Sequence, residues 1–105
     1  MKLAEGSVLF ARIDYKTGSQ QETEQDAMDS MGYLQGVARE RYLAAGIFGD
    51  PATETIDGAM ILFEAKDMEE ARRIADGDPI IQRGFYQYHL HQWNLMLTTP
   101  EADHQ

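Results

Sequence analysis

The chain has 105 residues, of which 18 are acidic and 9 are basic, so its formal net charge is -9 at pH 7. This charge repels phosphate backbones and anionic lipids, and no run approaches the roughly 20 apolar residues of a membrane span, so nucleic acid and membrane are excluded as expected partners. The absence of cysteine excludes disulfides, thiolate nucleophiles and cysteine-based metal sites. We expect a cytoplasmic protein of one domain.

Residues 7–15 are expected to form the first strand, because their side chains alternate between two faces. The alternation assigns three residues to a presumed core face and three to the opposite face, respectively Leu9, Ala11 and Ile13, and Val8, Phe10 and Arg12. Residues 22–45 then carry helical periodicity. Gly32 and Gly36 within this helix are expected to allow close approach to a neighbouring strand.

Three further strands are expected, the first two at residues 43–48 and 58–65, joined by a hairpin loop. The last covers residues 85–97, and its alternation places polar and aromatic side chains in a row on one face: Gln87, His89, His91 and Trp93. Residues 98–105 are expected to form a polar tail outside the single domain of residues 1–97.

The most informative stretch of the sequence is residues 67–84, which combines a helix with an Asp-Pro turn. Asp67 can cap this helix, which must end near Gly77, and Pro79 suits the first turn of a second, short helix. We expect Asp78 to cap that short helix, so that its carboxylate lies in a defined bend.

The order strand, helix, strand, strand, helix, strand predicts an α+β fold, a ferredoxin-like sandwich with an antiparallel sheet. Its two helices can cover only one face of the sheet, although several strands carry apolar groups on both faces. We therefore expect a homodimer, with a higher oligomer left open, in which two sheets form a shared α/β barrel around a small-molecule pocket. A monomer whose open sheet binds a different protein is the alternative.

Several short patterns in a fixed order resemble those of the YCII-related family of dimeric α/β-barrel proteins. They are Tyr33-Leu34 through Ala44-Ala45-Gly46, the strand 58–65 with Asp67-Met68-Glu69-Glu70-Ala71 after it, and Asp78-Pro79 with Gly84. The resemblance covers nearly the whole chain. It implies a dimer with a pocket, in which a histidine of the first helix lies beside the aspartate of the Asp-Pro turn.

Asp78 matches the family's aspartate, but residues 26–36 contain no histidine, and the nearest equivalent position is Asp29 or Ser30. Asp78 has two interpretations. In an apolar interior it can act as a base or as an orienting carboxylate, because desolvation raises the pKa of a carboxyl group. Alternatively, it only caps the short helix.

His89 and His91 are two apart on a strand and therefore project from the same face. They are candidates for catalysis or for a ligand-pocket wall that Trp93 continues, and packing at a dimer interface is the other interpretation. A metal site would require a third ligand, which the sequence does not identify.

Arg12 shares its strand face with Phe10, so both are candidates for substrate binding if that face lines a cavity. A buried arginine needs a partner, which either an anionic substrate group or a carboxylate such as Asp14 would supply. A salt bridge at an interface is the other interpretation.

Two hypotheses follow. The first is a small cofactor-independent enzyme that transfers a proton, as an isomerase or by lyase-like elimination, on a compact cyclic or aromatic metabolite. It assigns catalysis to Asp78, His89 and His91, and substrate binding to Arg12, Phe10 and Trp93. The second is a non-catalytic homodimer that binds a small molecule or supports a partner protein. The sequence contains no nucleotide-binding or metalloenzyme motif, so we expect neither a cofactor nor a metal.

Overall fold

The computed structural model describes residues 6–53, 55–97 and 99–100. Its elements follow in the order β1 (Val8–Lys16), α1 (Glu24–Ala38), β2 (Leu43–Asp50), η1 (Pro51–Thr53), β3 (Thr55–Ala65), α2 (Met68–Asp76), α3 (Pro79–Gln82) and β4 (Tyr86–Trp93). This is the expected order, and it confirms the α+β class. Within the ranges given above, no helix is long and apolar enough to cross a membrane.

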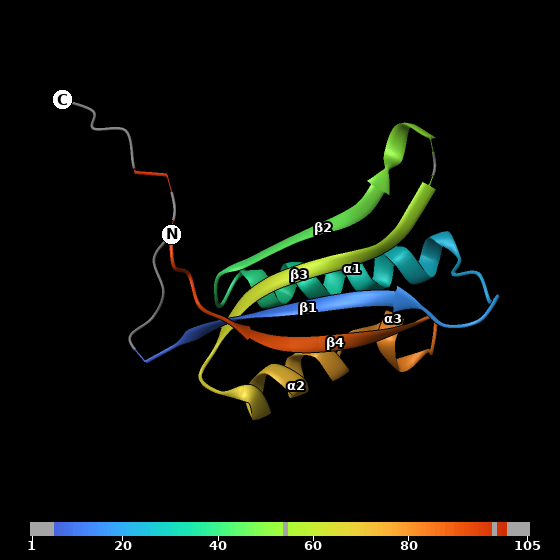
Figure 1. Cartoon of the computed structure of the whole chain (residues 1–105). Coiled ribbons are helices and arrows are strands. Elements are labelled where there is room, and N and C mark those ends of the chain that lie inside the picture. Colours follow the sequence, from blue (N-terminus) through green and yellow to red (C-terminus); the bar gives the residue numbers. More distant parts are fainter. Residues whose placement is uncertain (1–5, 54, 98, 101–105) are drawn as a thin grey trace.

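The four strands form one antiparallel sheet in the order β2-β3-β1-β4, and the helices lie on one side of it (Figure 1). β1 is central: its Arg12 pairs with Ile61 of β3 on one side and with Leu90 of β4 on the other. Because side chains of directly paired residues point to the same face, all three lie on one face of the sheet.

The helix-covered face contains the hydrophobic core. Its buried cluster combines strand residues with one residue from each of the two longer helices: Phe10, Leu34, Ile61, Phe63, Ala65 and Ala71. The presumed core face of β1 was therefore assigned wrongly, because the helices cover the face of Phe10 and Arg12 rather than that of Leu9, Ala11 and Ile13. Both faces of this strand are rich in apolar residues, so alternation alone could not distinguish them.

The first helix is shorter than its periodicity suggested. It begins with a capping box, in which the Thr23 hydroxyl accepts from the Asp26 amide at 3.0 Å and an Asp26 oxygen accepts from the Thr23 amide at 2.8 Å. It ends at Ala38 instead of residue 45. The expected close packing of Gly32 and Gly36 was wrong, since a Cβ added at either position would meet nothing within 4 Å.

The last strand is also shorter than expected and ends at Trp93 rather than at residue 97. Residues 94–97 follow it without regular secondary structure and are exposed. The pairing of β4 with β1 ends at Trp93, which lies opposite Leu9. The alternation of apolar residues in the sequence therefore continues beyond the paired part of the chain.

A contact between α1 and the end of α2 fixes the helices relative to each other. The Tyr33 hydroxyl donates to the Ile74 carbonyl at 2.7 Å. A Cβ at Gly77 would collide with the same hydroxyl, so the close approach requires glycine here. This contact lies immediately before Asp78 and places α1 beside the turn that carries the candidate carboxylate.

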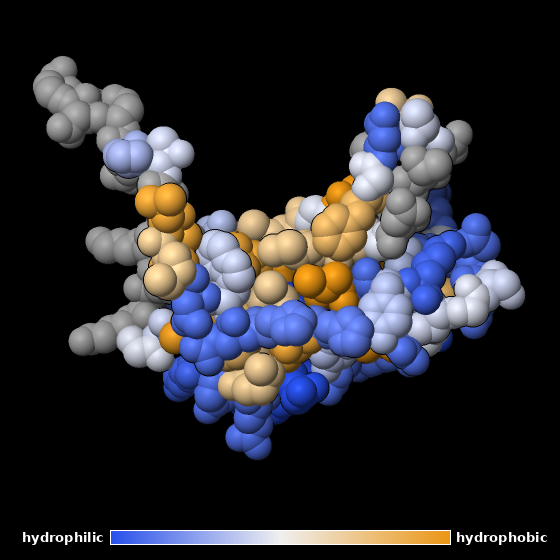
Figure 2. Space-filling view, in the orientation of Figure 1, coloured by the Kyte–Doolittle hydropathy of each residue, from blue (hydrophilic) through white to orange (hydrophobic). Residues whose placement is uncertain are grey.

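Among the described residues, no helix lies over the opposite face of the sheet. Figure 2 shows apolar side chains over its middle and a row of hydrophilic residues along one border. Trp93 and Phe48 are 39% and 40% exposed, and the Tyr15 and His89 rings stack with their centroids 4.9 Å apart. A second copy on this open face remains a prediction.

Candidate functional site

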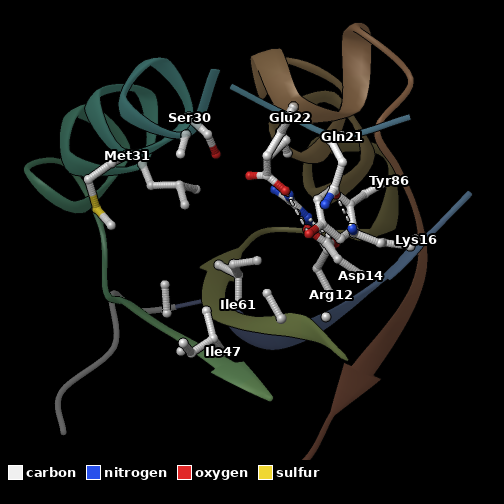
Figure 3. Close-up of a pocket in the computed structure, with 17 residues that line it drawn as sticks. Arg12, Asp14, Lys16, Gln21, Glu22, Ser30, Met31, Ile47, Ile61 and Tyr86 are labelled. Carbon is white, nitrogen blue, oxygen red and sulfur yellow. Dashed lines mark hydrogen bonds and ion pairs between the residues drawn. The ribbon is translucent and has the colours of Figure 1, made fainter. Parts of the chain in front are cut away.

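A cavity of about 520 Å³ lies between α1 and the helix-covered face of the sheet (Figure 3). Most of its wall is apolar and comes from α1, β2 and β3, with side chains that include Ala27, Met31, Leu34, Ala45, Ile47 and Ile61. Its other end is polar and contains Arg12, Asp14, Lys16, Gln21, Glu22 and Tyr86. The volume suits a small metabolite. The expected pocket was a hollow between two copies, whereas this cavity is formed by one chain.

A buried cluster of three charges lies at the polar end. Arg12 Nε donates to Asp14 Oδ1 at 2.8 Å, and Nη2 donates to Asp14 Oδ2 at 2.7 Å. Asp78 Oδ2 forms an ion pair with the same Nη2 at 3.0 Å. The exposed fractions of Arg12, Asp14 and Asp78 are 1%, 4% and 0%. A carboxylate partner for a buried Arg12 was expected, and the structure provides two.

Local sequence explains how the cluster forms. Arg12 and Asp14 are two apart on β1, so their side chains share a face and can meet in a bidentate pair. Asp78 reaches them from the turn between α2 and α3, where its Oδ1 accepts from the Ile80 amide at 3.1 Å. The expected capping role of Asp78, with Pro79 in the first helical turn, is therefore confirmed, and its second oxygen faces Arg12.

Burial affects the two partners on β1 differently. Burial raises the pKa of Asp14, and the hydrogen bond and charge of Arg12 oppose this shift only in part. For Arg12, burial acts to lower the pKa, but the hydrogen bond and charge of Asp14, followed by the charge of Asp78, raise it above its ordinary value. The guanidinium therefore stays charged between the two carboxyl groups.

A second polar pair lies at the same end of the cavity. The Tyr86 hydroxyl donates to Glu22 Oε1 at 2.8 Å, which links β4 to the connection before α1. Burial, followed by the hydrogen bond and charge of Glu22, raises the pKa of Tyr86 to about 12, so the phenol keeps its proton at neutral pH. Sequence reasoning missed this pair, because no local pattern links two residues that are 64 positions apart.

The other predicted site residues lie away from this cluster. Phe10 has no exposed surface and packs in the core, where its ring centroid is 6.4 Å from that of Phe63. His89, His91 and Trp93 pair with residues of the open face of β1. The sheet thus separates them from Arg12 and Asp78, so within one chain the histidines cannot act together with Asp78. Their functional roles remain predictions.

The two positions equivalent to the family's helix histidine differ in their surroundings. Ser30 is 8% exposed and lines the cavity. Asp29 instead forms an ion pair with Arg83 Nη1 at 2.8 Å near the surface. Of the two positions, Ser30 is therefore the one that lines the cavity. In the part of the chain that the structure describes, no three His, Asp or Glu side chains converge as metal ligands.

Comparisons with known proteins agree with this fold. The profile of a family described as the YCII-related domain matches residues 8–94. The solved structure of 5-chloro-2-hydroxyhydroquinone dehydrochlorinase (TftG) from Burkholderia phenoliruptrix AC1100, in complex with 2,5-dihydroxybenzoquinone, is similar with a TM-score of 0.67 and 20% identity. The similarity covers 82% of this chain and 93% of that chain.

A second similar structure is SnoaB, a cofactor-independent oxygenase from Streptomyces nogalater, with a TM-score of 0.51 and 14% identity. The similarity covers 90% of this chain and 98% of that chain. At these identities the two similarities establish a shared fold. No curated protein matches the chain significantly.

Proposed function

The chain belongs to the YCII-related domain family, and from this premise we propose that it is a small cofactor-independent enzyme that transfers a proton on a compact cyclic or aromatic metabolite. Isomerisation and lyase-like elimination are the two reaction types proposed. The observation that carries the proposal is the Arg12 guanidinium, held between Asp14 and Asp78 at the wall of a largely apolar cavity.

The cavity walls suit a ring-shaped ligand. Burial of a ring against the apolar side chains of α1, β2 and β3 supplies binding free energy, and the polar end orients its oxygen substituents. Arg12 Nε and Nη2 already contact carboxylates, and within the described ranges Nη1 has no hydrogen-bond or ion-pair partner. In our proposal Nη1 donates to a ligand oxygen and stabilises negative charge that develops there during proton transfer.

Asp78 takes the orienting role in this proposal. It has no exposed surface and is not part of the cavity wall. Its ion pair with Arg12 therefore holds the guanidinium without contacting the cavity. Phe10 packs in the core on the same face of β1 as Arg12. His89, His91 and Trp93 are proposed to line the interface between two copies on the open face. A cytoplasmic location is part of the same proposal.

A second candidate function is a non-catalytic homodimer that binds a small molecule. The observation that favours it is the open sheet face, where Trp93 and the stacked rings of Tyr15 and His89 are exposed beside apolar side chains. A second copy would remove this surface from water. In this alternative the cavity binds its ligand without converting it.

The proposed cavity can be tested with a pair of neighbouring variants. Ala45→Leu extends a side chain into the cavity, whereas Ala44→Leu makes the same change on the opposite face of β2. Two compact ring compounds serve as probes: 2,5-dihydroxybenzoquinone, which is the ligand in the TftG complex, and 5-nitrobenzisoxazole.

Titration calorimetry should show that the unmodified protein and Ala44→Leu bind a probe with similar affinity. Ala45→Leu should bind roughly tenfold more weakly or worse, because the added methyl groups occupy the ligand's space. Equal binding by both variants, or no binding of either probe by the unmodified protein, would contradict the proposed site.

A further inference from the structure

Three carboxylates lie near the polar end of the cavity: Asp14, Asp78 and Glu22. Asp14 and Asp78 both contact Arg12. Asp78 Oδ1 accepts from the Ile80 amide and Oδ2 is in the ion pair with Arg12, while the residue has no exposed surface. A ligand in the cavity therefore has no access to Asp78. This excludes Asp78 as the group that takes a proton directly from a ligand.

Asp14 lines the cavity, but each of its oxygens accepts a hydrogen bond from Arg12, at 2.8 and 2.7 Å. A ligand proton could reach Asp14 only if one of these hydrogen bonds from Arg12 broke first. Asp14 is therefore suited to holding Arg12 and poorly suited to accepting a proton during a reaction.

Glu22 differs from both. Its side chain lines the cavity and is half-buried, and Figure 3 shows its carboxylate directed toward the cavity interior. Oε1 accepts one hydrogen bond, from the neutral phenol of Tyr86, and no hydrogen bond or ion pair reaches Oε2 from any residue that the structure describes. Glu22 is thus the carboxylate at the polar end that has an oxygen free to accept a proton from a ligand.

We propose that Glu22 is the general base of the cavity and that Tyr86 is a positioning residue, which holds the Glu22 carboxylate by its hydrogen bond. This inference rests on the proposed function of the same cavity. Neither residue was indicated by the sequence patterns, and neither occupies the position of the family's helix histidine.

The proton transfer balances without a further reactant. A C–H bond of the ligand breaks, its proton moves to Glu22 Oε2, and the electron pair remains on the ligand as an enolate whose oxygen faces Arg12. In an isomerisation the proton returns from Oε2 to another carbon. In an elimination the electron pair expels the leaving group, and the proton passes from Glu22 to water.

The test uses 5-nitrobenzisoxazole, a compact aromatic carbon acid. When a base removes its ring proton, the N–O bond breaks and a coloured nitrophenolate with a nitrile group forms, so the reaction needs no cofactor. The unmodified protein should accelerate this reaction above an equal concentration of acetate. Glu22→Gln keeps an acceptor for the Tyr86 hydroxyl but removes the base, and should lower kcat/KM roughly 100-fold or more.

Tyr86→Phe supplies a readout that a merely structural role would not change. The Tyr86 hydroxyl orients the Glu22 carboxylate and Tyr86→Phe keeps the ring, so the variant should lower kcat while leaving KM nearly unchanged. The other charged groups at this end, Arg12, Asp14 and Lys16, are unchanged in the variant. An unaltered kcat would overturn the positioning role of Tyr86.

Glu24→Gln is the matched control, because Glu24 is exposed in the first turn of α1 and does not line the cavity. It should react at the rate of the unmodified protein. If Glu22→Gln does so as well, Glu22 is not the base, although the proposed function stands. If the unmodified protein binds the probe without accelerating its reaction, the general base is overturned and the non-catalytic alternative is favoured. If it neither binds nor reacts, the proposed function fails too.

Discussion

Polar side chains on the two faces of the sheet differ in burial and in their partners. On the helix-covered face, Arg12, Asp14 and Asp78 are almost completely buried, and each contacts an opposite charge. On the open face, His89 and His91 are exposed, with ring centroids 6.5 Å apart. A buried charge requires a partner, whereas an exposed imidazole is satisfied by water. The difference shows that the charged groups on the covered face are held in fixed positions by one another.

The two faces also differ in whether they adjoin a cavity within one chain. The covered face adjoins a cavity within one chain, and its charged groups are held by several contacts each. The open face offers apolar and aromatic surface that a second copy would cover. In our proposal, ligands therefore bind at the covered face and a second copy associates at the open face.

The largest effect should come from removing the central cation of the covered face. Arg12→Ala leaves Asp14 and Asp78 buried without a counter-charge and should cost about 3–5 kcal/mol of unfolding free energy. The matched control is Arg83→Ala, since Arg83 also bridges two carboxylates but is 44% exposed.

The Arg83→Ala change should have a small effect that shrinks further with added salt, because water already screens exposed charges. Denaturant unfolding monitored by circular dichroism measures both variants. Similar losses for Arg12→Ala and Arg83→Ala would mean that burial does not distinguish the two clusters.

On the open face, a charged substitution should break association. The protein should sediment at micromolar concentration with roughly twice the monomer mass of 11.9 kDa, and Trp93→Glu should reduce this to one monomer mass, since it would bury an unpaired charge. Met28→Glu, which changes an exposed apolar residue on α1, should leave the mass of the assembly unchanged. A monomeric unmodified protein would remove the assigned role of the open face.

Gly58 and Gly36 differ in the space that a side chain would have at each position. Gly58 has φ +141, and a Cβ there would collide with the Asp14 carbonyl oxygen, so Gly58→Ala should destabilise the protein by about 1–3 kcal/mol. Gly36→Ala places a methyl group in open space within α1 and should stabilise the protein by about 0.5–1 kcal/mol. Thermal unfolding of both variants checks the opposite signs.

The smallest effect concerns acid pH, where Asp14 and Asp26 should behave oppositely. Burial raises the folded-state pKa of Asp14 above its unfolded value of 3.8. Protonated Asp14 therefore stabilises the fold fully below pH 3.8, and this contribution is lost as the pH rises through the folded-state pKa. The hydrogen bonds from Thr23, followed by Arg83, lower the pKa of Asp26. Its contribution is therefore present above pH 3.8 and is lost as the pH falls through the folded-state value.

Carboxyl-carbon NMR titration measures these two midpoints directly. The midpoint of Asp14 should lie above 3.8 and that of Asp26 below it. The reverse order would show that burial does not control the protonation of the cluster on the covered face.

The sequence predicted the element order well, because each element depends on local signals. Asp67 and Asp78 cap helices as expected, and Pro79 starts the short helix. The identity of the covered face depended instead on tertiary packing. Since apolar residues occur on both faces of β1, only the docking of the helices decides that Arg12 lies inside.

Part of the candidate site was predictable for the same reason. Alternation on β1 made Asp14 a natural partner for Arg12, and the Asp-Pro turn fixed the bend at Asp78. The contact between Glu22 and Tyr86 joins two distant segments, so no local pattern could identify it. The row of His89 and His91 was recognised correctly as a row, but a single sequence does not tell which face of the sheet carries the cavity.

The central claim is that ligands bind in the cavity between α1 and the covered face of a single chain. A crystal structure of the protein soaked with 2,5-dihydroxybenzoquinone tests it most directly. We predict ligand density between Met31 and Ile61, with a ligand oxygen within hydrogen-bonding distance of Arg12. Density found only on the open face beside His89 and His91, with the cavity filled by side chains, would contradict this account.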